Sequence, residues 1–430
     1  MACNLAGVNH KNHGCHFLPS VPQLLAPLRS AALFTLEFPT KQYYRIMPNS
    51  TKPQPKFRLK DHLFNRDRVE FLANLFVAVD ESFDTKRFVR DTTAQFPKLE
   101  LKARIAHIAS VLEEHLHHEF RVAAKQINLA LPPALDPKQT DGDFGDFILA
   151  PLGEFVVRRG LSKQHLKLSL RTLKELTMRF SMEDALRYFI NEFSEPTFAE
   201  LKKWSTDRNY HVRRLVSEAT RPRLPWSGRL TTDIHRPLEL LTTLHADPTR
   251  YVTRSVANHL NDIAKTDPSV VIKTLMQWRG LALQRPAELK WMTAHALRTL
   301  VKQGDETALR LLGYRDQPKI TISSLELSAT SVAPGEAIGF QFDLSAQRDE
   351  RLLIDYVIDF VKAGGKTGGK VFKLKQLELA KGKTQTITKR HPFRADATTF
   401  RLYPGVHRIT LQINGKRYAT ATFEMKADRA

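Results

Sequence analysis

One predicted helix near the middle of the chain separates its charged side chains from its apolar ones. It lies in residues 211–226, which read HVRRLVSEATRPRLPW. At 100° per residue the apolar residues form one stripe: Val212, Leu215, Val216 and Ala219. Arg214, Glu218 and Arg221 fall within roughly a 60° arc of the opposite face. One carboxylate between two guanidinium groups indicates a site for an anionic partner.

The residues after this helix place a cation and a large aromatic ring on a stiff turn. Pro222 ends the helix, and Arg223, Pro225 and Trp226 follow. Such a turn could contact a phosphate group and stack on a base. Two simpler interpretations stay open. Glu218 could only pair with its two neighbouring arginines at the surface, and Trp226 could be an apolar plug of the turn.

The overall charge of the chain agrees with a polyanionic partner. Its 430 residues carry 66 lysines and arginines against 45 acidic residues, a net charge of +21. The sequence contains no run of about 18 apolar residues, so neither a transmembrane helix nor a membrane partner is expected. Cys3 and Cys15 alone provide no disulfide framework. These features are most consistent with a reducing, cytoplasmic setting.

A period of forty residues organises the helical part of the chain. Asp207 and Asp247 each begin a predicted helix, and Arg254 in the second helix occupies the place of Arg214 in the first. A third copy is the helix WMTAHALRTLVK at residues 291–302. This period is typical of HEAT-like helical pairs, which stack into a curved solenoid. We expect Asp207 and Asp247 to be N-caps, because their carboxylates can accept from free N–H groups at the helix starts.

Two polar residues extend the same face on the second repeat helix. Asn258 and Asp262 lie one turn apart. They could contact a ligand or bridge neighbouring repeats. Bridging is the preferred interpretation for Asn258, and both stay open for Asp262.

The periodicity divides the chain into three parts. Residues 1–55 read as a disordered extension, with Met47 as an alternative natural start, and residues 56–317 are helical. In residues 318–430 the pattern alternates, with strands expected at 320–327, 338–344, 352–361, 371–377, 407–413 and 419–425. The expected fold class is an all-α HEAT-like repeat solenoid followed by an all-β immunoglobulin-like sandwich. Asn414-Gly415 predicts a two-residue hairpin turn, and His407 stands where such domains carry a corner tyrosine.

Four stretches together carry a family resemblance: RFSMEDALRYFI (179–190), HVRRLVSEATRPRLPW (211–226), YVTRSVANHLNDIAKTDP (251–268) and HALRTLVKQGDETALRLLG (295–313). They resemble the AlkC branch of the bacterial alkylpurine DNA glycosylases, over about residues 56–313. Some members of that branch carry a C-terminal immunoglobulin-like domain. The resemblance implies a HEAT-like repeat enzyme that excises N3-methylated bases, chiefly 3-methyladenine and 3-methylcytosine, without flipping the lesion into a deep pocket.

Such a reaction needs carboxylates rather than a strong acid, because a base alkylated at a ring nitrogen is cationic and already a good leaving group. The site must offset the oxocarbenium-like charge of the sugar and place a water. Glu218 is the candidate from the repeat, and the resemblance adds Glu183, at the acidic position of the RFSxE motif. Asp262 is the third catalytic candidate. Glu183 has a simpler interpretation as an acidic residue in a first helical turn.

The remaining candidates would bind the DNA. Trp226 would lie against the cationic base or the sugar. The expected phosphate contacts are arginines of the repeats and the turn: Arg214, Arg221, Arg223 and Arg254. Asn258 would contact the DNA beside them. The segment AGGKTGGK (363–370) reads as a flexible basic loop. It is either a simple linker or a contact of Lys366 and Lys370 with the DNA backbone.

Three classes of function are compatible with the sequence. The main hypothesis is a monofunctional, metal-independent DNA glycosylase, a monomer without cofactors that acts on double-stranded DNA containing alkylated bases. The acidic and histidine-rich stretch at residues 113–119 lacks the HExxH order, so no metal site is expected there. The alternative is a non-catalytic HEAT-repeat DNA-binding scaffold. A protein-interaction solenoid is the third class, and the basic face with Arg214 and Arg221 argues against it.

Overall fold

The computed structural model describes residues 58–136, 138, 144–395 and 400–427. The expectations for residues 1–55 lie outside these ranges. The first elements are helical, including two 3-10 turns: α1 (Leu59–Leu63), α2 (Arg66–Val77), α3 (Thr85–Thr93), η1 (Phe96–Lys98), α4 (Leu101–His115), α5 (Phe120–Ala130), η2 (Phe147–Leu149), α6 (Ala150–Gly160), α7 (Leu166–Thr177), α8 (Glu183–Glu192), α9 (Ser194–Trp204), α10 (Tyr210–Ala219), α11 (Leu238–Leu244), α12 (Arg250–Ile263), α13 (Pro268–Leu281), α14 (Pro286–Ala296), α15 (Arg298–Gln303) and α16 (Glu306–Leu311).

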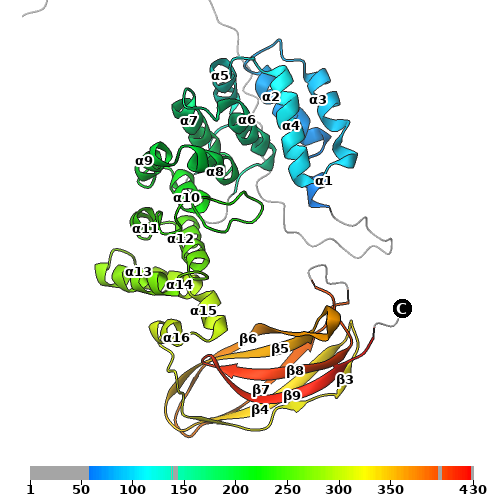
Figure 1. Ribbon diagram of the computed structural model, residues 1–430, viewed down its shortest axis with the longest axis vertical. Coiled ribbons are helices and arrows are strands. Elements are labelled where there is room, and N and C mark those ends of the chain that lie inside the picture. The colour runs from blue at the N-terminus through cyan, green and yellow to red at the C-terminus, as the bar shows by residue number, and fades with distance from the viewer. Residues whose placement is uncertain (1–57, 137, 139–143, 396–399, 428–430) are drawn as a thin grey trace, which may run out of the picture. The chain divides into compact units, whose positions relative to one another are not determined.

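The helices around the predicted repeat are stacked in pairs. Figure 1 shows α8, α10, α12 and α14 following one another, with α9, α11 and α13 beside them, and α12 packs on both α10 and α14. The apolar stripe predicted on α10 is confirmed, because all four of its residues are fully buried. Burying one such side chain stabilises the fold by about 1.5–3 kcal/mol. Successive repeat helices therefore share one continuous core.

The expected N-caps were wrong by two residues. The side chain of Asn209 caps α10, and Thr249 is the residue before α12. Asp207 and Asp247 lie in the turns just before, where each accepts a hydrogen bond at 2.8 Å from the N–H two residues later. Asp247 also pairs with Arg213 of α10 at 2.5 Å. These aspartates thus hold the turns between repeats.

A β-sandwich follows the helices. Its strands are β1 (Ile320–Ile322), β2 (Glu326–Leu327), β3 (Ser331–Val332), β4 (Ala337–Ala346), β5 (Glu350–Val361), β6 (Thr367–Leu379), β7 (Thr384–Pro392), β8 (Gly405–Ile413) and β9 (Lys416–Met425), with a 3-10 turn η3 (Ala363–Gly365). One sheet has the order β1-β4-β2 with β7 also paired to β4, and the other has the order β3-β9-β8-β5-β6. The two sheets enclose a separate apolar core. The expected fold class is confirmed.

The structure corrects the expected strand pattern in several places. The strand expected at 320–327 is interrupted and forms β1 and β2, and β3 was not expected. Strand β7 was not expected, because only Ile387 and His391 are buried in it and its apolar alternation is weak. Residues 363–370 were expected to form one loop, whereas β6 already begins at Thr367. Lys366 immediately precedes this strand, and Lys370 lies within it.

Two turn features of the sandwich agree with its local sequence. Asn414 and Gly415 both have positive φ, 44° and 81°, and they join β8 to β9 as the predicted two-residue hairpin. His407 is fully buried, and its Nε2 lies 3.0 Å from the carbonyl oxygen of Tyr403. A corner tyrosine makes a comparable bond to upstream backbone. The histidine therefore performs this anchoring here.

Among the described residues, no helix is both long and apolar enough to cross a membrane.

We expect Asp247→Ala to lower the free energy of unfolding by about 3 kcal/mol, because it leaves the guanidinium of Arg213 without its buried partner. Loss of an N-cap alone would cost only about 1 kcal/mol. Asp207→Ala is the matched control, since Asp207 is more exposed and its partner is the flexible Lys174. Urea unfolding followed by helical circular dichroism measures both. Equal losses near 1 kcal/mol would show that the pair with Arg213 adds nothing to the turn hydrogen bond that each aspartate makes.

Candidate active site

Two helices bring two carboxylates to one guanidinium group. Glu183 is the first residue of α8, Arg214 lies in the middle of α10, and Glu218 lies one turn after it. Arg214 Nη1 is 3.6 Å from Glu183 Oε2, and Arg214 Nη2 is 3.5 Å from Glu218 Oε2. Arg214 also donates to the hydroxyl of Ser181 at 2.6 Å. The structure therefore joins the two predicted catalytic glutamates through one shared counter-ion.

The cluster continues to the third predicted carboxylate. Arg221, just past α10, donates to Glu218 Oε1 at 2.6 Å and to Asp262 Oδ2 at 2.8 Å. Lys265 holds the other oxygen of Asp262 at 2.8 Å. Glu183, Glu218 and Asp262 thus belong to one series of alternating charges across α8, α10 and α12.

Burial of these charges corrects the expected position of the polar face. Arg214, Glu218 and Asp262 are only 6%, 5% and 3% exposed. The face that was expected to meet solvent is an interface between helices. Because carboxylates already hold the guanidinium groups of Arg214 and Arg221, we assign these two arginines as counter-ions rather than phosphate contacts. Glu218 does pair with Arg214 and Arg221, but these ion pairs are buried between helices and not at the surface.

The surroundings shift the pKa values of the two glutamates in opposite directions. Burial opposes the ionisation of Glu218, yet Arg214, Arg221 and the Ser255 hydroxyl hold its pKa below the ordinary value. Burial raises the pKa of Glu183, and the charge of Arg214 only partly offsets that rise. Oε2 of Glu183 is buried without a hydrogen-bond partner. Paired groups whose pKa values diverge are typical of sites where the two perform different tasks.

Aromatic rings enclose the shared guanidinium group. Its carbon lies 5.4 Å from the ring centroid of Phe144 and 4.9 Å from that of Tyr251. The two rings meet edge to face at 5.6 Å. Sequence reasoning missed both residues as parts of the cluster. Tyr251 is the first residue of one of the stretches that carry the family resemblance, but no role was assigned to it. Phe144 lies outside the regular helices, where no periodicity marks it.

The turn after α10 presents its aromatic ring to solvent. Trp226 is 81% exposed and has a positive φ of 74°, which is rare for a bulky residue. The plug interpretation is therefore wrong. Lys102 donates to the backbone carbonyl of Trp226, and Arg223 in the same turn is also exposed. Both residues are accessible to a large ligand.

A buried arginine of α8 fastens this turn. Arg187 donates to the carbonyl oxygens of Ala219, Arg221 and Gly228 at 2.8–2.9 Å. These bonds fix the backbone on both sides of Trp226. The same helix therefore positions Glu183 and the exposed turn.

The second repeat helix places its polar residues toward the next repeat. Asn258 Oδ1 accepts from His295 Nε2 at 2.8 Å and from Arg298 Nη2 at 3.0 Å. This geometry supports the bridging interpretation of Asn258. Arg254 lies one turn earlier on α12 and is partly buried.

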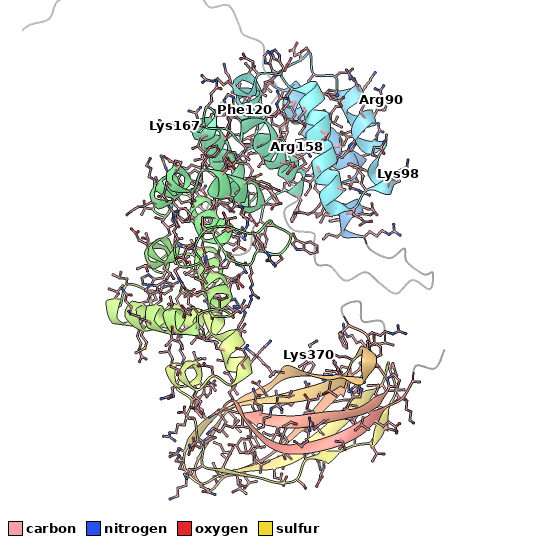
Figure 2. The ribbon with its side chains drawn as sticks, in the orientation of Figure 1. Arg90, Lys98, Phe120, Arg158, Lys167 and Lys370 are labelled. Carbon is pink, nitrogen blue, oxygen red and sulfur yellow. The ribbon has the colours of Figure 1, made fainter. Side chains whose placement is uncertain are left out.

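The two predicted basic residues of the sandwich lie just before β6 and within it. Lys370 is exposed on β6, and its ammonium group lies 4.8 Å from the ring centroid of Phe400 (Figure 2). Lys366 is exposed in the turn before β6. Among the residues that the structure describes, no cluster of histidine, cysteine and acidic side chains could hold a metal ion.

Comparisons with known proteins identify the family. The family model described as "Uncharacterised protein YhaZ, C-terminal Ig-like domain" matches residues 321–427. The uncharacterised protein YhaZ of Bacillus subtilis (strain 168) is 33% identical over 367 residues, which cover 84% of this chain and 98% of that protein. The structure of the Pseudomonas fluorescens alkylpurine DNA glycosylase AlkC, bound to DNA containing an abasic site analogue, matches with a TM-score of 0.77. It is 33% identical, and the match covers 86% of this chain and 99% of that one. This chain belongs to the AlkC/YhaZ family.

Family membership confirms the resemblance found in the sequence, including the immunoglobulin-like domain. It covers both the helical part that carries the carboxylate cluster and the sandwich. The AlkC structure in the match is a complex with DNA.

The buried histidine behind the cluster predicts a pH dependence of stability. His259 is fully buried with Nδ1 3.0 Å from the carbonyl oxygen of Ser217, and burial lowers its pKa to about 4. The unfolded chain, with a histidine pKa near 6.5, then binds more protons between about pH 6.5 and 4. Stability should therefore fall through this window as pH decreases, by up to about 1.4 kcal/mol per pH unit from this group.

Urea unfolding of the wild type and His259→Gln at a series of pH values measures this slope. The variant should be less stable overall, with a shallower slope below about pH 6.5 and a curve parallel to the wild type above about pH 7. An unchanged slope in the acidic range would show that His259 does not carry the effect.

Proposed function

We propose that this chain is a monofunctional DNA glycosylase that hydrolyses the N-glycosidic bond of cationic N3-alkylated bases, 3-methyladenine and 3-methylcytosine, in double-stranded DNA. The observation that carries the proposal is the cluster in which Arg214 joins Glu183 to Glu218 beside the exposed turn of Trp226. The family assignment and the DNA-bound relative support it. The proposed enzyme works as a monomer and leaves an intact abasic site.

The cluster fits the chemistry of this reaction. An N3-alkylated base is cationic and leaves without a strong acid, so the enzyme has to stabilise the positive charge that develops on the sugar and supply a water. Glu218 is held as an anion by its partners and suits the first task. The side chain of Glu183 is 23% exposed, more than that of Glu218, so it suits the second. Asp262 supports both by holding Arg221 in place.

The exposed residues and the partly buried Arg254 are assigned to the DNA itself. Trp226 lies against the cationic base or the deoxyribose, since an aromatic face attracts a cation. Arg223 and Arg254 are the phosphate contacts of the helical part, and Lys366 and Lys370 those of the sandwich. The net charge of +21 favours such a polyanionic partner. Because the methylated nitrogen of 3-methyladenine lies in the minor groove, the helical part approaches the DNA from that side.

The alternative is a DNA-binding scaffold without catalytic activity. It would use the same exposed basic residues but would not need the carboxylates. Arg214 and Arg221 are largely buried, so they do not argue against a protein-interaction solenoid. The exposed Arg223 and Trp226 and the DNA-bound relative favour a DNA-binding protein instead.

We expect Glu218→Gln to abolish release of 3-methyladenine and 3-methylcytosine from methylated DNA in EDTA while DNA binding persists. The substitution keeps the size of the side chain and removes the anion that offsets the charge of the sugar. Loss of one such electrostatic contact costs about 100- to 1000-fold in rate. Single-turnover release and a fluorescence binding assay measure the two properties.

Glu288→Gln is the matched control, because Glu288 is an equally buried glutamate that pairs with Arg250 outside the cluster. It should keep a rate close to that of the wild type. No release by the wild-type protein would sink the glycosylase proposal and favour the scaffold. Equal rates for Glu218→Gln and the wild type would remove Glu218 from the site.

We expect Trp226→Gly to slow base release by about 2- to 30-fold, which corresponds to a cation–aromatic contact of about 0.5–2 kcal/mol. Glycine tolerates the positive φ at this position, so the thermal midpoint should stay the same or rise. Met276→Ala, at another exposed apolar side chain, is the control. An unchanged rate for Trp226→Gly would leave this ring without a role in the reaction.

A further inference from the structure

Different helices hold the two oxygens of Glu218. Oε1 accepts from Arg221 at 2.6 Å, while Oε2 accepts from the Ser255 hydroxyl at 2.6 Å and lies 3.5 Å from Arg214 Nη2. The two arginines come from α10 and the turn just after it, but Ser255 comes from α12. The hydroxyl therefore ties the carboxylate to the following repeat.

Both guanidinium groups are shared with other acceptors. Arg221 also holds Asp262, and Arg214 also faces Glu183. Each guanidinium group is therefore positioned by two carboxylates and not by Glu218 alone. The Ser255 hydroxyl has no second carboxylate to serve in the contacts that the structure describes, so its bond can fix Oε2 of Glu218 alone.

A second hydroxyl lies beside the first. Ser217 Oγ lies 2.9 Å from Ser255 Oγ, and both side chains are almost completely buried. The Ser255 hydroxyl is placed to donate to Ser217 Oγ or to Glu218 Oε2, and its one proton points to the carboxylate, which is the stronger acceptor. Water does not compete with this bond, because both hydroxyls are buried.

We propose that Ser255 is a positioning residue for Glu218, whose hydroxyl fixes the carboxylate as an anion aimed at the reacting sugar. This role rests on the proposed function of Glu218. Ser255 acts through Glu218 and is not assigned any contact with DNA.

The same helix supplies a matched control. Thr253 donates to Glu288 Oε1 at 2.6 Å, and Arg250 pairs with Glu288 Oε2 at 2.5 Å. Thr253 lies two residues before Ser255 and so faces the other side of α12, toward α14. It makes the same hydroxyl–carboxylate–arginine arrangement outside the cluster.

The test compares Ser255→Ala, Ser217→Ala and Thr253→Val with the wild type. We expect Ser255→Ala to slow single-turnover release of 3-methyladenine by about 10- to 100-fold, the range for loss of a hydrogen bond to a charged group. Its affinity for an abasic-site duplex should be unchanged. Ser217→Ala should show a smaller loss of the same kind. Thr253→Val should lower the thermal midpoint but keep the rate.

The pH profile separates positioning from general destabilisation. Without the hydroxyl, Glu218 becomes protonated at a higher pH, so the acid limb of the rate profile should move to higher pH in Ser255→Ala and stay in place in Thr253→Val. The charged and titratable groups that also face Glu218 are unchanged in both variants: Glu183 and Arg187 of α8, Arg214 and Arg221, and Tyr251, His259 and Asp262 of α12.

Two results would overturn the inference without affecting the proposed function. One is a full rate for Ser255→Ala while Glu218→Gln is inactive. The other is a loss of rate matched by Thr253→Val at an equal loss of stability, with the acid limb unmoved, because that pattern describes a purely structural hydroxyl. Failure of the wild-type protein to release any base would instead reject the proposed function itself.

Discussion

The buried guanidinium group of Arg214 is the constraint on which the rest of the site depends. Removing such a charge from water costs several kcal/mol, and only close partners of opposite charge offset that cost. Here the partners are Glu183 from α8 and Glu218 from α10, with the rings of Phe144 and Tyr251 over the guanidinium group. Because Glu183 comes from α8 and Arg214 from α10, a small shift between these helices would separate this buried pair. The pair of Arg221 with Asp262 ties α12 to the same cluster, so these charges fix the relative positions of α8, α10 and α12.

The same principle recurs along the helical part. A cation of one repeat meets an acidic side chain of the next in several places: Lys174 with Asp207, Arg213 with Asp247, Arg221 with Asp262, and Arg250 with Glu288. Arg213 and Arg214 are neighbours in α10 that point to different partners, one in the turn before α12 and one in the cluster. Ordinary joints between repeats and the candidate site are thus built from the same chemistry. What distinguishes the site is that two largely buried cations, Arg214 and Arg221, each serve two carboxylates.

Periodicity predicted the features that depend on one helix or one turn alone. The apolar stripe of α10, the repeated helical pairs and the hairpin at Asn414 are of this kind, since each follows from local spacing. Burial of Arg214 could not be predicted in this way. The sequence of one helix shows the same charged stripe whether that stripe meets solvent or another helix. Whether Arg214 is buried depends on how α8 and α12 pack against α10. Likewise, β7 was missed because only Ile387 and His391 of that strand contribute to the core.

The positions of individual side chains were the least predictable part. Asp207 and Asp247 have the residue type of an N-cap, but their hydrogen bonds fall in the preceding turns because each helix begins three residues later. Trp226 beside two prolines had the composition of an apolar plug, yet its positive φ turns the ring to solvent. Such outcomes depend on backbone angles that tertiary contacts impose, here the three bonds from Arg187.

Under the proposed function, this arrangement explains how a site without a deep base pocket can be selective. A neutral base is a poor leaving group, so carboxylates that only offset charge on the sugar cannot release it at a useful rate. A cationic base supplies the missing activation itself. Selectivity then comes from the lesion's own charge, and the protein needs only a fixed anion such as Glu218, an accessible carboxylate such as Glu183 and a ring such as Trp226 at the surface. This arrangement lowers the stability of the fold, because two carboxylates are buried close together. Arg214 offsets their repulsion by pairing with both.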